Sequence, residues 1–174
     1  MKRKIKKICA VFVIIVLLPY IITIFMNGKS IEANQDGKNG YIKVKTKSGT
    51  KEVPLKEYCI GTLAKEISVD FEEEALKAQA VIVRTTIYKK IEEEGNKAVM
   101  TERFFTKSDM KNQWGRSTFQ KNYKKLERVW NETDGQVVMY NGQLAMVPFH
   151  QLSNGKTRIG KEVLGTDEYP YLQM

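Results

Sequence analysis

Residues 53–88 read VPLKEYCIGTLAKEISVDFEEEALKAQAVIVRTTIY and decide most of what the sequence predicts about the fold. Proline is favoured in the first turn of a helix, where no N–H partner is needed, so Pro54 indicates a helix start and we expect a first helix over residues 55–67. Asp70 and Glu73 have the spacing of a capping box, which predicts the start of a second helix. The stretch therefore predicts two helices joined by a short break.

The first of these helices carries a carboxylate on its apolar stripe. The stripe recurs at spacings of three and four and consists of Leu55, Cys59, Thr62, Leu63 and Glu66. A carboxyl group in apolar surroundings keeps its proton to higher pH, as a general acid requires. Glu66 is therefore a candidate catalytic acid. The alternative is an ion pair of Glu66 with Lys77 or Arg84 that only neutralises a buried charge.

The second helix is apolar on nearly all sides in its middle, where residues 75–83 read ALKAQAVIV. Such a helix is normally buried on most of its surface, so its polar side chains need partners. Lys77 and Arg84 are seven residues apart and share one edge of the helix. Gln79 points about 200° away from Lys77 around the helix axis. The sequence thus predicts two polar edges on one buried helix.

Shorter elements are expected on both sides of the two helices. They are a strand over residues 41–47 with a partner over 50–53, a strand over 103–106, a helix that begins at Ser117 or Thr118, and a hairpin that joins 136–140 to 143–149. The hairpin prediction depends on Asn141-Gly142, a strong signal for a type I′ turn. The expected fold class is α+β, with helices packed on small antiparallel sheets.

The N-terminus predicts a membrane anchor. Residues 8–26 read ICAVFVIIVLLPYIITIFM, a run of 19 residues without a charge that can span a bilayer. Five lysine and arginine residues at positions 2–7 indicate a cytoplasmic N-terminus. We expect an uncleaved, single-pass signal anchor in the cell membrane, with a cleaved signal peptide as the alternative. The expected organisation is a basic tail at 1–7, the anchor at 8–26, a polar linker at 27–40 and an extracytoplasmic domain at 41–174.

Composition limits the classes of partner. The chain has 174 residues and a formal net charge of +9, which suits an anionic wall or membrane surface. No motif of a nucleic-acid-binding module is present, so nucleic acid is not an expected partner. The two cysteines, Cys9 and Cys59, are not expected to pair, and Cys59 is expected to be a small core residue.

The only histidine, His150, lies in the segment FHQLSNGKT at residues 149–157. Together with residues 53–88, this segment resembles the SpoIID/LytB family, which comprises stage II sporulation protein D and related amidase enhancers. The first family motif stands here as VPLKEYCIGTLAKEI followed by EEALKAQAVIVRTTIY. The second stands as FHQLSNGKT followed by Pro-Tyr-Leu at 170–172. Gln151 departs from the second motif, because that position often holds a small hydroxyl residue.

The resemblance implies a lytic transglycosylase that cleaves peptidoglycan glycan strands in sporulation or wall remodelling, with a cell-wall amidase as a partner. The alternative is a non-catalytic module of the same family that binds glycan or stimulates an amidase. The family's catalytic acid carries over onto Glu66. The implied substrate-binding residues are Lys77, Gln79, Arg84, Thr85, His150, Ser153 and Thr157. From the residues alone, His150 has the alternative of a hydrogen-bonded structural histidine.

Two departures from the family pattern add further expectations. Some family members hold zinc through cysteines near the second motif, but no cysteine follows Cys59 in this chain, so we expect no metal and no cofactor. The family usually continues beyond Pro-Tyr-Leu with a glycine-rich motif. This sequence stops at Met174, and the expectation is a shortened domain.

Overall fold

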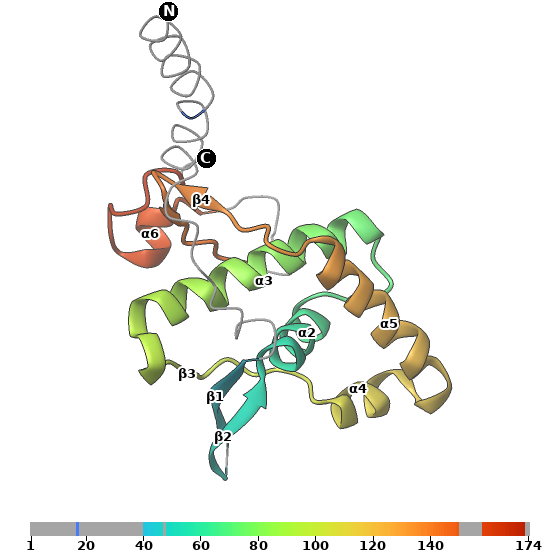
Figure 1. Ribbon diagram of the computed structural model, residues 1–174. Helices are drawn as coiled ribbons and strands as arrows, with labels where there is room; N and C mark the ends of the chain where they lie inside the picture. Colours follow the sequence, from blue (N-terminus) through green and yellow to red (C-terminus); the bar gives the residue numbers. More distant parts are fainter. Residues whose placement is uncertain (1–16, 18–39, 47, 150–157, 173–174) are drawn as a thin grey trace, which may run out of the picture. The chain divides into compact units, whose positions relative to one another are not determined.

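The computed structural model of the protein describes residue 17 and residues 40–46, 48–149 and 158–172 (Figure 1). The chain divides into two units, Met1–Lys38 and Asn39–Met174, and the fold described below is that of the second. The expected tail, the expected anchor apart from residue 17, and nearly all of the expected linker lie outside the described residues. Within the described part of the chain, no helix has both the length and the apolar character needed to cross a membrane.

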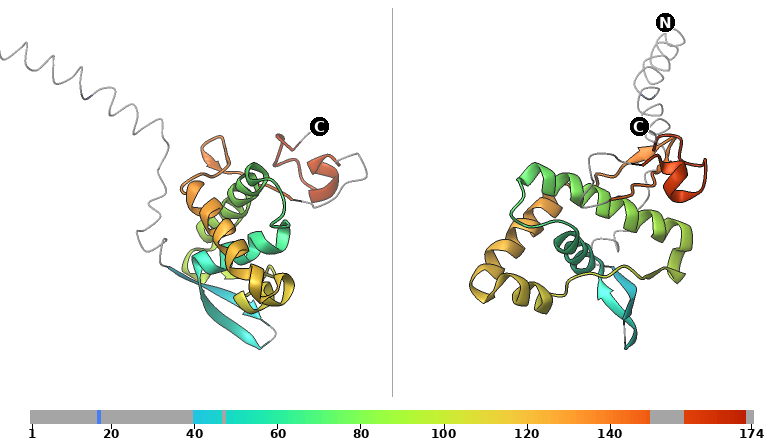
Figure 2. Two further views of the ribbon diagram at one scale, coloured as in Figure 1. Left: turned by 90° about the vertical axis from the view of Figure 1, so that its right-hand side faces the viewer. Right: turned by 180° about the vertical axis from the view of Figure 1, so that it is seen from behind.

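The second unit combines helices with short strands, and this confirms the α+β class. In chain order its elements are β1 (Tyr41–Thr46), β2 (Gly49–Pro54), α2 (Leu55–Glu66), α3 (Glu73–Glu94), the 3-10 helix η2 (Gly95–Lys97), β3 (Val99–Met100), α4 (Lys107–Trp114), α5 (Arg116–Glu132), β4 (Met139–Tyr140), β5 (Gln143–Leu144) and α6 (Gly160–Leu164). The β4–β5 hairpin and α6 lie on one side of α3, and α2 with β1 and β2 lies on the other (Figures 1 and 2).

The larger sheet is mixed, which corrects the expectation of purely antiparallel sheets. Its strand order is β2-β1-β3, and β1 pairs antiparallel with β2 but parallel with β3. A parallel pair requires a crossover connection, and here the chain passes through α2 and α3 before it returns as β3. Val44 faces Met100 in this pair, and both side chains are 1% exposed. The sheet therefore belongs to the same core as the helices.

The turn of the second sheet is as predicted. β4 and β5 form an antiparallel pair around Asn141 and Gly142, whose φ angles are 49° and 78°. Positive φ at both central residues defines the type I′ turn that Asn-Gly favours. The strands are only two residues long each, shorter than the expected 136–140 and 143–149.

The two central helices have nearly the predicted bounds, but the start of α3 differs. The capping box predicted from Asp70 and Glu73 is wrong, because Glu72 is the N-cap residue and makes no capping bond with its side chain. Asp70 instead accepts a hydrogen bond from the Ser68 hydroxyl at 3.3 Å, within the connection between the helices. Gly95 ends α3 with a φ of 58°, a backbone angle that glycine adopts without strain.

The region after β3 contains a helix that sequence analysis missed. The predicted strand over residues 103–106 is wrong: these residues are irregular and lead into α4. α4 begins with a capping box, in which the Thr106 hydroxyl accepts from the Asp109 N–H and the Asp109 carboxylate accepts from the Thr106 N–H. The Thr-x-x-Asp spacing was the available signal. α5 then starts at Arg116, after Gly115 with a φ of 80°.

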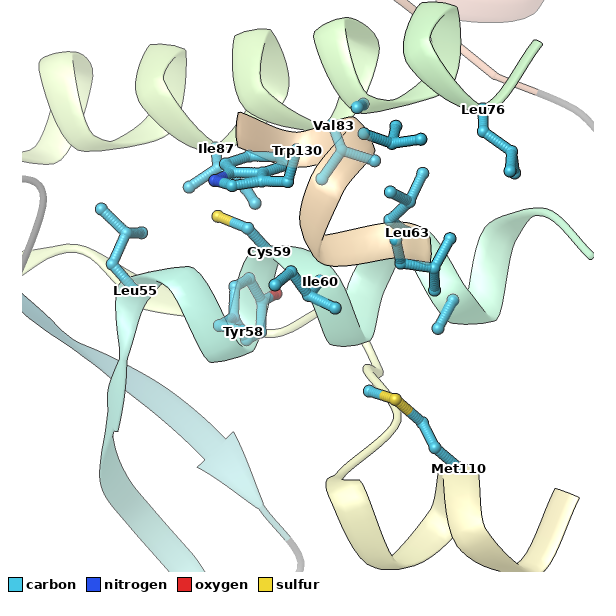
Figure 3. Close-up of a cluster of buried hydrophobic side chains, with 14 of the residues drawn as sticks. Leu55, Tyr58, Cys59, Ile60, Leu63, Leu76, Val83, Ile87, Met110 and Trp130 are labelled. Atoms are coloured by element: carbon cyan, nitrogen blue, oxygen red, sulfur yellow. The ribbon is translucent and has the colours of Figure 1, made fainter. Parts of the chain in front are cut away.

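The core lies where α2 packs against both α3 and α5 (Figure 3). Its central side chains are fully or nearly fully buried and comprise Tyr58, Cys59, Ile60, Leu63, Leu76, Val83, Ile87, Met110, Leu126 and Trp130. Cys59 is 0% exposed, which confirms its prediction as a core residue. Burial of about ten such side chains is the main source of stability for a domain of this size.

Gly61 permits a close crossing of the chain over the middle of α2. The Phe105 N–H donates to the Gly61 carbonyl at 3.0 Å. A Cβ atom at position 61 would collide with the Phe105 carbonyl oxygen and would lie 2.7 Å from Cδ2 of Phe104. The segment that joins β3 to α4 therefore lies directly on the backbone of α2.

We expect Gly61→Ala to lower the free energy of unfolding by about 1–3 kcal/mol, because a backbone oxygen cannot move aside easily. Helix propensity alone predicts the opposite sign, since alanine is favoured over glycine by about 1 kcal/mol. Chemical denaturation followed by tryptophan fluorescence measures the difference. The control is Ala78→Gly at an exposed position of α3, which should cost about 1 kcal/mol. A Gly61→Ala variant at least as stable as the wild type would contradict the close crossing.

Candidate active site around Glu66

Glu66 is the last residue of α2, and it meets α3 through Gln79. Its side chain is half-buried, and its Oε2 accepts a hydrogen bond from Nε2 of Gln79 at 2.7 Å. Gln79 itself is 3% exposed. The buried amide therefore holds the carboxylate in one orientation at the junction of the two helices.

The pKa of Glu66 lies above its ordinary value. Desolvation by burial is the largest cause, and the negative charge of Glu102 acts in the same direction. The hydrogen bond from Gln79 and the charge of Lys65 lower the pKa and offset part of this effect. The net result is a carboxyl group that keeps its proton to higher pH than an exposed glutamate.

A cavity of about 300 Å³ opens beside this carboxyl group. Its lining comes from α2, α3, the end of β3 and the chain that follows β5, and includes Tyr58, Thr62, Glu66, Thr86, Lys89, Lys90, Met100, Glu102 and Val147. Small-molecule pockets begin at about this volume. The cavity is therefore large enough for part of a ligand to reach the Glu66 carboxyl group.

Other polar groups of the cavity come from residues that sequence analysis did not identify. The Tyr58 hydroxyl donates to the carbonyl of Glu102 at 3.3 Å and to its carboxylate at 3.4 Å. The Lys90 ammonium lies 3.9 Å from the same carboxylate. Lys89 donates to the Leu144 carbonyl at 3.3 Å. These contacts join residues that are up to 55 positions apart, so no local pattern could have found them.

Lys77 lies away from this cavity. Its ammonium is 3.0 Å from the carboxylates of Glu74 and Glu132 and 3.6 Å from that of Glu73. The hydrogen bonds that Lys77 donates to Glu74 and Glu132 raise its pKa. These partners belong to α3 and α5, so the structure does not bring Lys77 together with Glu66.

Arg84 is buried against the end of α5. Its side chain is 0% exposed, and its guanidinium donates to the carbonyls of Thr133 at 2.7 Å, Trp130 at 2.9 Å and Gln136 at 3.2 Å. Its Cζ lies 4.0 Å from the centroid of the Trp130 ring. Helix ends leave unpaired carbonyls, and Arg84 supplies their donors. The structure therefore gives Arg84 a role in helix packing and places it outside the cavity.

Thr85 is also 0% exposed. Its hydroxyl donates to the Val81 carbonyl at 2.7 Å and accepts from the Val138 N–H at 2.9 Å. Both hydrogen bonds are internal, so Thr85 attaches the chain before β4 to α3. Of the expected substrate-binding residues on α3, the structure thus brings Gln79 alone to Glu66.

The remaining expected site residues, His150, Ser153 and Thr157, lie outside the described residues. Val147 lines the cavity three positions before His150. Within the described part of the chain, no group of three or more histidine, cysteine, aspartate or glutamate side chains is placed to hold a metal ion. Cys59 is buried in the core, where desolvation raises the pKa of its thiol, and this disfavours the thiolate form that binds zinc.

Comparison with known proteins identifies the family of this chain. The family model SpoIID, described as stage II sporulation protein, matches residues 43–140, more than half of the chain. The chain belongs to the SpoIID family.

Two curated relatives are both stage II sporulation protein D. The chain is 35% identical over 133 residues to that of Bacillus subtilis (strain 168) and 34% identical over 131 residues to that of Bacillus amyloliquefaciens. Each match covers 70% of this chain and 38% of the relative. The match thus spans well under half the length of these relatives.

The raised pKa of Glu66 predicts a pH-dependent stability. The folded chain binds more protons than the unfolded chain between the ordinary value of 4.5 and the higher folded pKa, so stability falls as pH rises through this window and stays lower above it. Glu66→Gln removes the cost of ionising a half-buried carboxyl group and keeps an acceptor for Gln79. We expect this variant to have the higher free energy of unfolding at pH 7, with the difference vanishing below about pH 4.5.

Urea denaturation across pH 3–8 measures both curves. Glu92→Gln, which removes an exposed carboxylate from α3, controls for the loss of one negative charge. A Glu66→Gln variant that is less stable than the wild type at pH 7 would show that the ionised carboxylate is favoured by its surroundings.

Proposed function

We propose that the chain is a membrane-anchored lytic transglycosylase that cleaves the glycan strands of peptidoglycan, with Glu66 as its single acid and base. The observation that supports this most directly is the half-buried carboxyl group of Glu66 at the edge of a cavity, with a raised pKa. Membership of the SpoIID family supports the same reading. A general acid must hold its proton near the working pH, and burial of Glu66 acts in that direction.

The reaction needs one carboxyl group. The protonated Glu66 donates its proton to the glycosidic oxygen as the bond from that oxygen to the anomeric carbon breaks. The resulting carboxylate takes the proton of the sugar's C6 hydroxyl, whose oxygen bonds to the anomeric carbon. The products are a new hydroxyl end and a 1,6-anhydro end, and no water is consumed. Hydrolytic glycosidases, by contrast, use a pair of carboxylates.

Gln79 orients the acid. Its Nε2 donates to Oε2 of Glu66, which favours protonation at Oε1 and fixes the plane of the carboxyl group. A fixed donor close to the scissile bond lowers the entropic cost of proton transfer. The lysines of the cavity, Lys89 and Lys90, would lie along the bound strand.

The setting proposed for this reaction is the outer face of the cell membrane. Residues 8–26 supply the anchor, and the unit from Asn39 to Met174 acts on the wall outside. The names of the two relatives point to sporulation as the process. A cell-wall amidase that cuts the peptide side chains is the proposed partner.

Digestion of purified glycan strands tests the proposal. We expect mass spectrometry to detect 1,6-anhydro ends, and Glu66→Gln to lower their rate of formation by about 10²–10⁴-fold, because general acid catalysis contributes that much. Glu92→Gln is the matched control and should keep wild-type activity. The circular dichroism spectra of both variants report on their folding.

Glycan that the wild-type chain binds but does not cut would contradict the proposed enzymatic activity. It would favour the alternative of a non-catalytic module that binds glycan or stimulates an amidase. Amidase rates measured with and without the chain then identify that role.

The pH profile of activity tests the role of Gln79. Because its hydrogen bond lowers the pKa of Glu66, Gln79→Leu should raise that pKa and move the alkaline limb of the profile to higher pH. Gln120→Leu, at an exposed position of α5, is the control. An alkaline limb that stays in place, or moves to lower pH, would show that the hydrogen bond from Gln79 does not lower the pKa of Glu66.

A further inference from the structure

The positive charge of the chain is concentrated in two segments. The formal total is +9, and residues 2–7 supply five basic residues and no acid. Residues 103–128, which include α4 and most of α5, supply eight basic and two acidic residues, a net of +6. The remainder of the chain therefore carries a net charge of −2. A field this uneven attracts anions to one part of a surface.

The two acids of this segment are engaged elsewhere. Asp109 serves in the capping box of α4, where its carboxylate accepts from Thr106. Glu127 pairs with Lys56 of α2 at 2.9 Å. Neither acid is therefore available to neutralise the exposed lysines of α5.

The polar face of α5 presents a basic stripe. Lys121, Lys124, Lys125 and Arg128 follow the spacing i, i+3, i+4 and i+7, and so share one side of the helix, on which none of its four buried residues lies. We call these four residues the α5 basic stripe.

Its members differ in how they are held. Lys125 donates to the carbonyls of Val69 at 2.8 Å and Phe71 at 3.0 Å, which fixes its position without neutralising its charge. Arg128 pairs with Glu73. Lys121 and Lys124 are exposed, and among the described residues no ion pair joins either to an acid.

The surroundings of the stripe indicate the chemistry of its partner. None of the exposed large hydrophobic side chains of the described residues belongs to residues 103–128, but Phe71, whose carbonyl accepts from Lys125, is 55% exposed beside the stripe. A single ring supplies far less apolar surface than the apolar face of a helix that lies in a membrane interface. The rings of Trp114 and Tyr123 both pack against Phe119, at centroid distances of 6.4 and 5.6 Å. They are thus engaged in packing, whereas proteins that bind single-stranded nucleic acid stack bases on exposed rings.

We propose that the α5 basic stripe binds a linear phosphodiester polymer without bases, a polyol phosphate, in water. Lysine and arginine are the usual partners of phosphate groups. The stripe extends about 10 Å along the helix, so it can contact successive phosphates of one strand. It shares no residue with the lining of the Glu66 cavity. Binding therefore does not depend on the proposed glycan cleavage.

Fluorescence anisotropy of the full chain with labelled poly(glycerol phosphate) tests the inference. We expect the double variant Lys121→Glu/Lys124→Glu to weaken binding at least about tenfold, and a rise from 50 to 200 mM salt to weaken wild-type binding by a similar factor. The matched control, Lys43→Glu/Lys45→Glu on exposed positions of β1, makes the same change in net charge and should bind within about twofold of the wild type. Glu66→Gln should bind as the wild type does.

Three outcomes would overturn the proposal. The first is wild-type affinity in the α5 double variant. The second is an equal loss in the β1 control, which would mean that net charge alone decides binding. The third is tighter binding, at equal phosphate concentration, to single-stranded DNA or to phosphatidylglycerol vesicles than to the polymer. Failure of glycan cleavage leaves all three measurements interpretable, because none of them uses the Glu66 cavity.

Discussion

The buried guanidinium of Arg84 is the constraint on which the helix arrangement depends. It donates hydrogen bonds to carbonyl groups at the end of α5 and lies over the ring of Trp130. Arg84 therefore joins the middle of α3 to the end of α5. Desolvation makes such a charge costly and lowers the pKa of Arg84. Several carbonyl acceptors and a ring face offset that cost. A shorter or uncharged side chain would leave these carbonyls without donors inside the protein.

The same helix carries the partner of the candidate acid. Gln79 lies five residues before Arg84, which turns it by about 140° around α3, towards α2 instead of α5. α3 is therefore held by α5 on one face and orients Glu66 from another. Thr85 adds a third attachment, to the chain before β4. The geometry of the carboxyl group is thus a product of packing on several sides of one helix.

Local signals explain which parts of the fold could be predicted. Pro54 fixes its own φ angle at a helix start, and the Asn141-Gly142 pair tolerates the positive φ angles of a tight turn. The elements that they bound are present. α4 was missed because its short, polar sequence has little hydrophobic periodicity. The capping-box spacing of Thr106 and Asp109 could have predicted its start. The parallel pairing of β3 with β1 depends on a crossover that no local pattern encodes.

The candidate site was predictable in part for the same reason. Helical periodicity placed Glu66 on the buried face, and half-burial of its side chain agrees with this. The contacts of Tyr58 with Glu102 arise only where the chain crosses α2 at Gly61, so they needed the tertiary structure. Family resemblance assigned Arg84 and Thr85 to substrate binding, but a sequence pattern cannot tell a polar side chain that faces a ligand from one that satisfies a helix end.

The lining of the Glu66 cavity spans residues 58–147, and this determines when during synthesis the pKa of Glu66 can rise. On α2 alone the carboxyl group would be hydrated and as acidic as any free glutamate, because only enclosure by later segments removes water from it. A chain synthesised from its N-terminus would carry a hydrated, ordinary carboxylate at position 66 until β3 and the chain after β5 had left the ribosome. Contacts of such long sequence separation form slowly, and the last of them must await the synthesis of residue 147. The pKa of Glu66 therefore rises only late in the production of the chain.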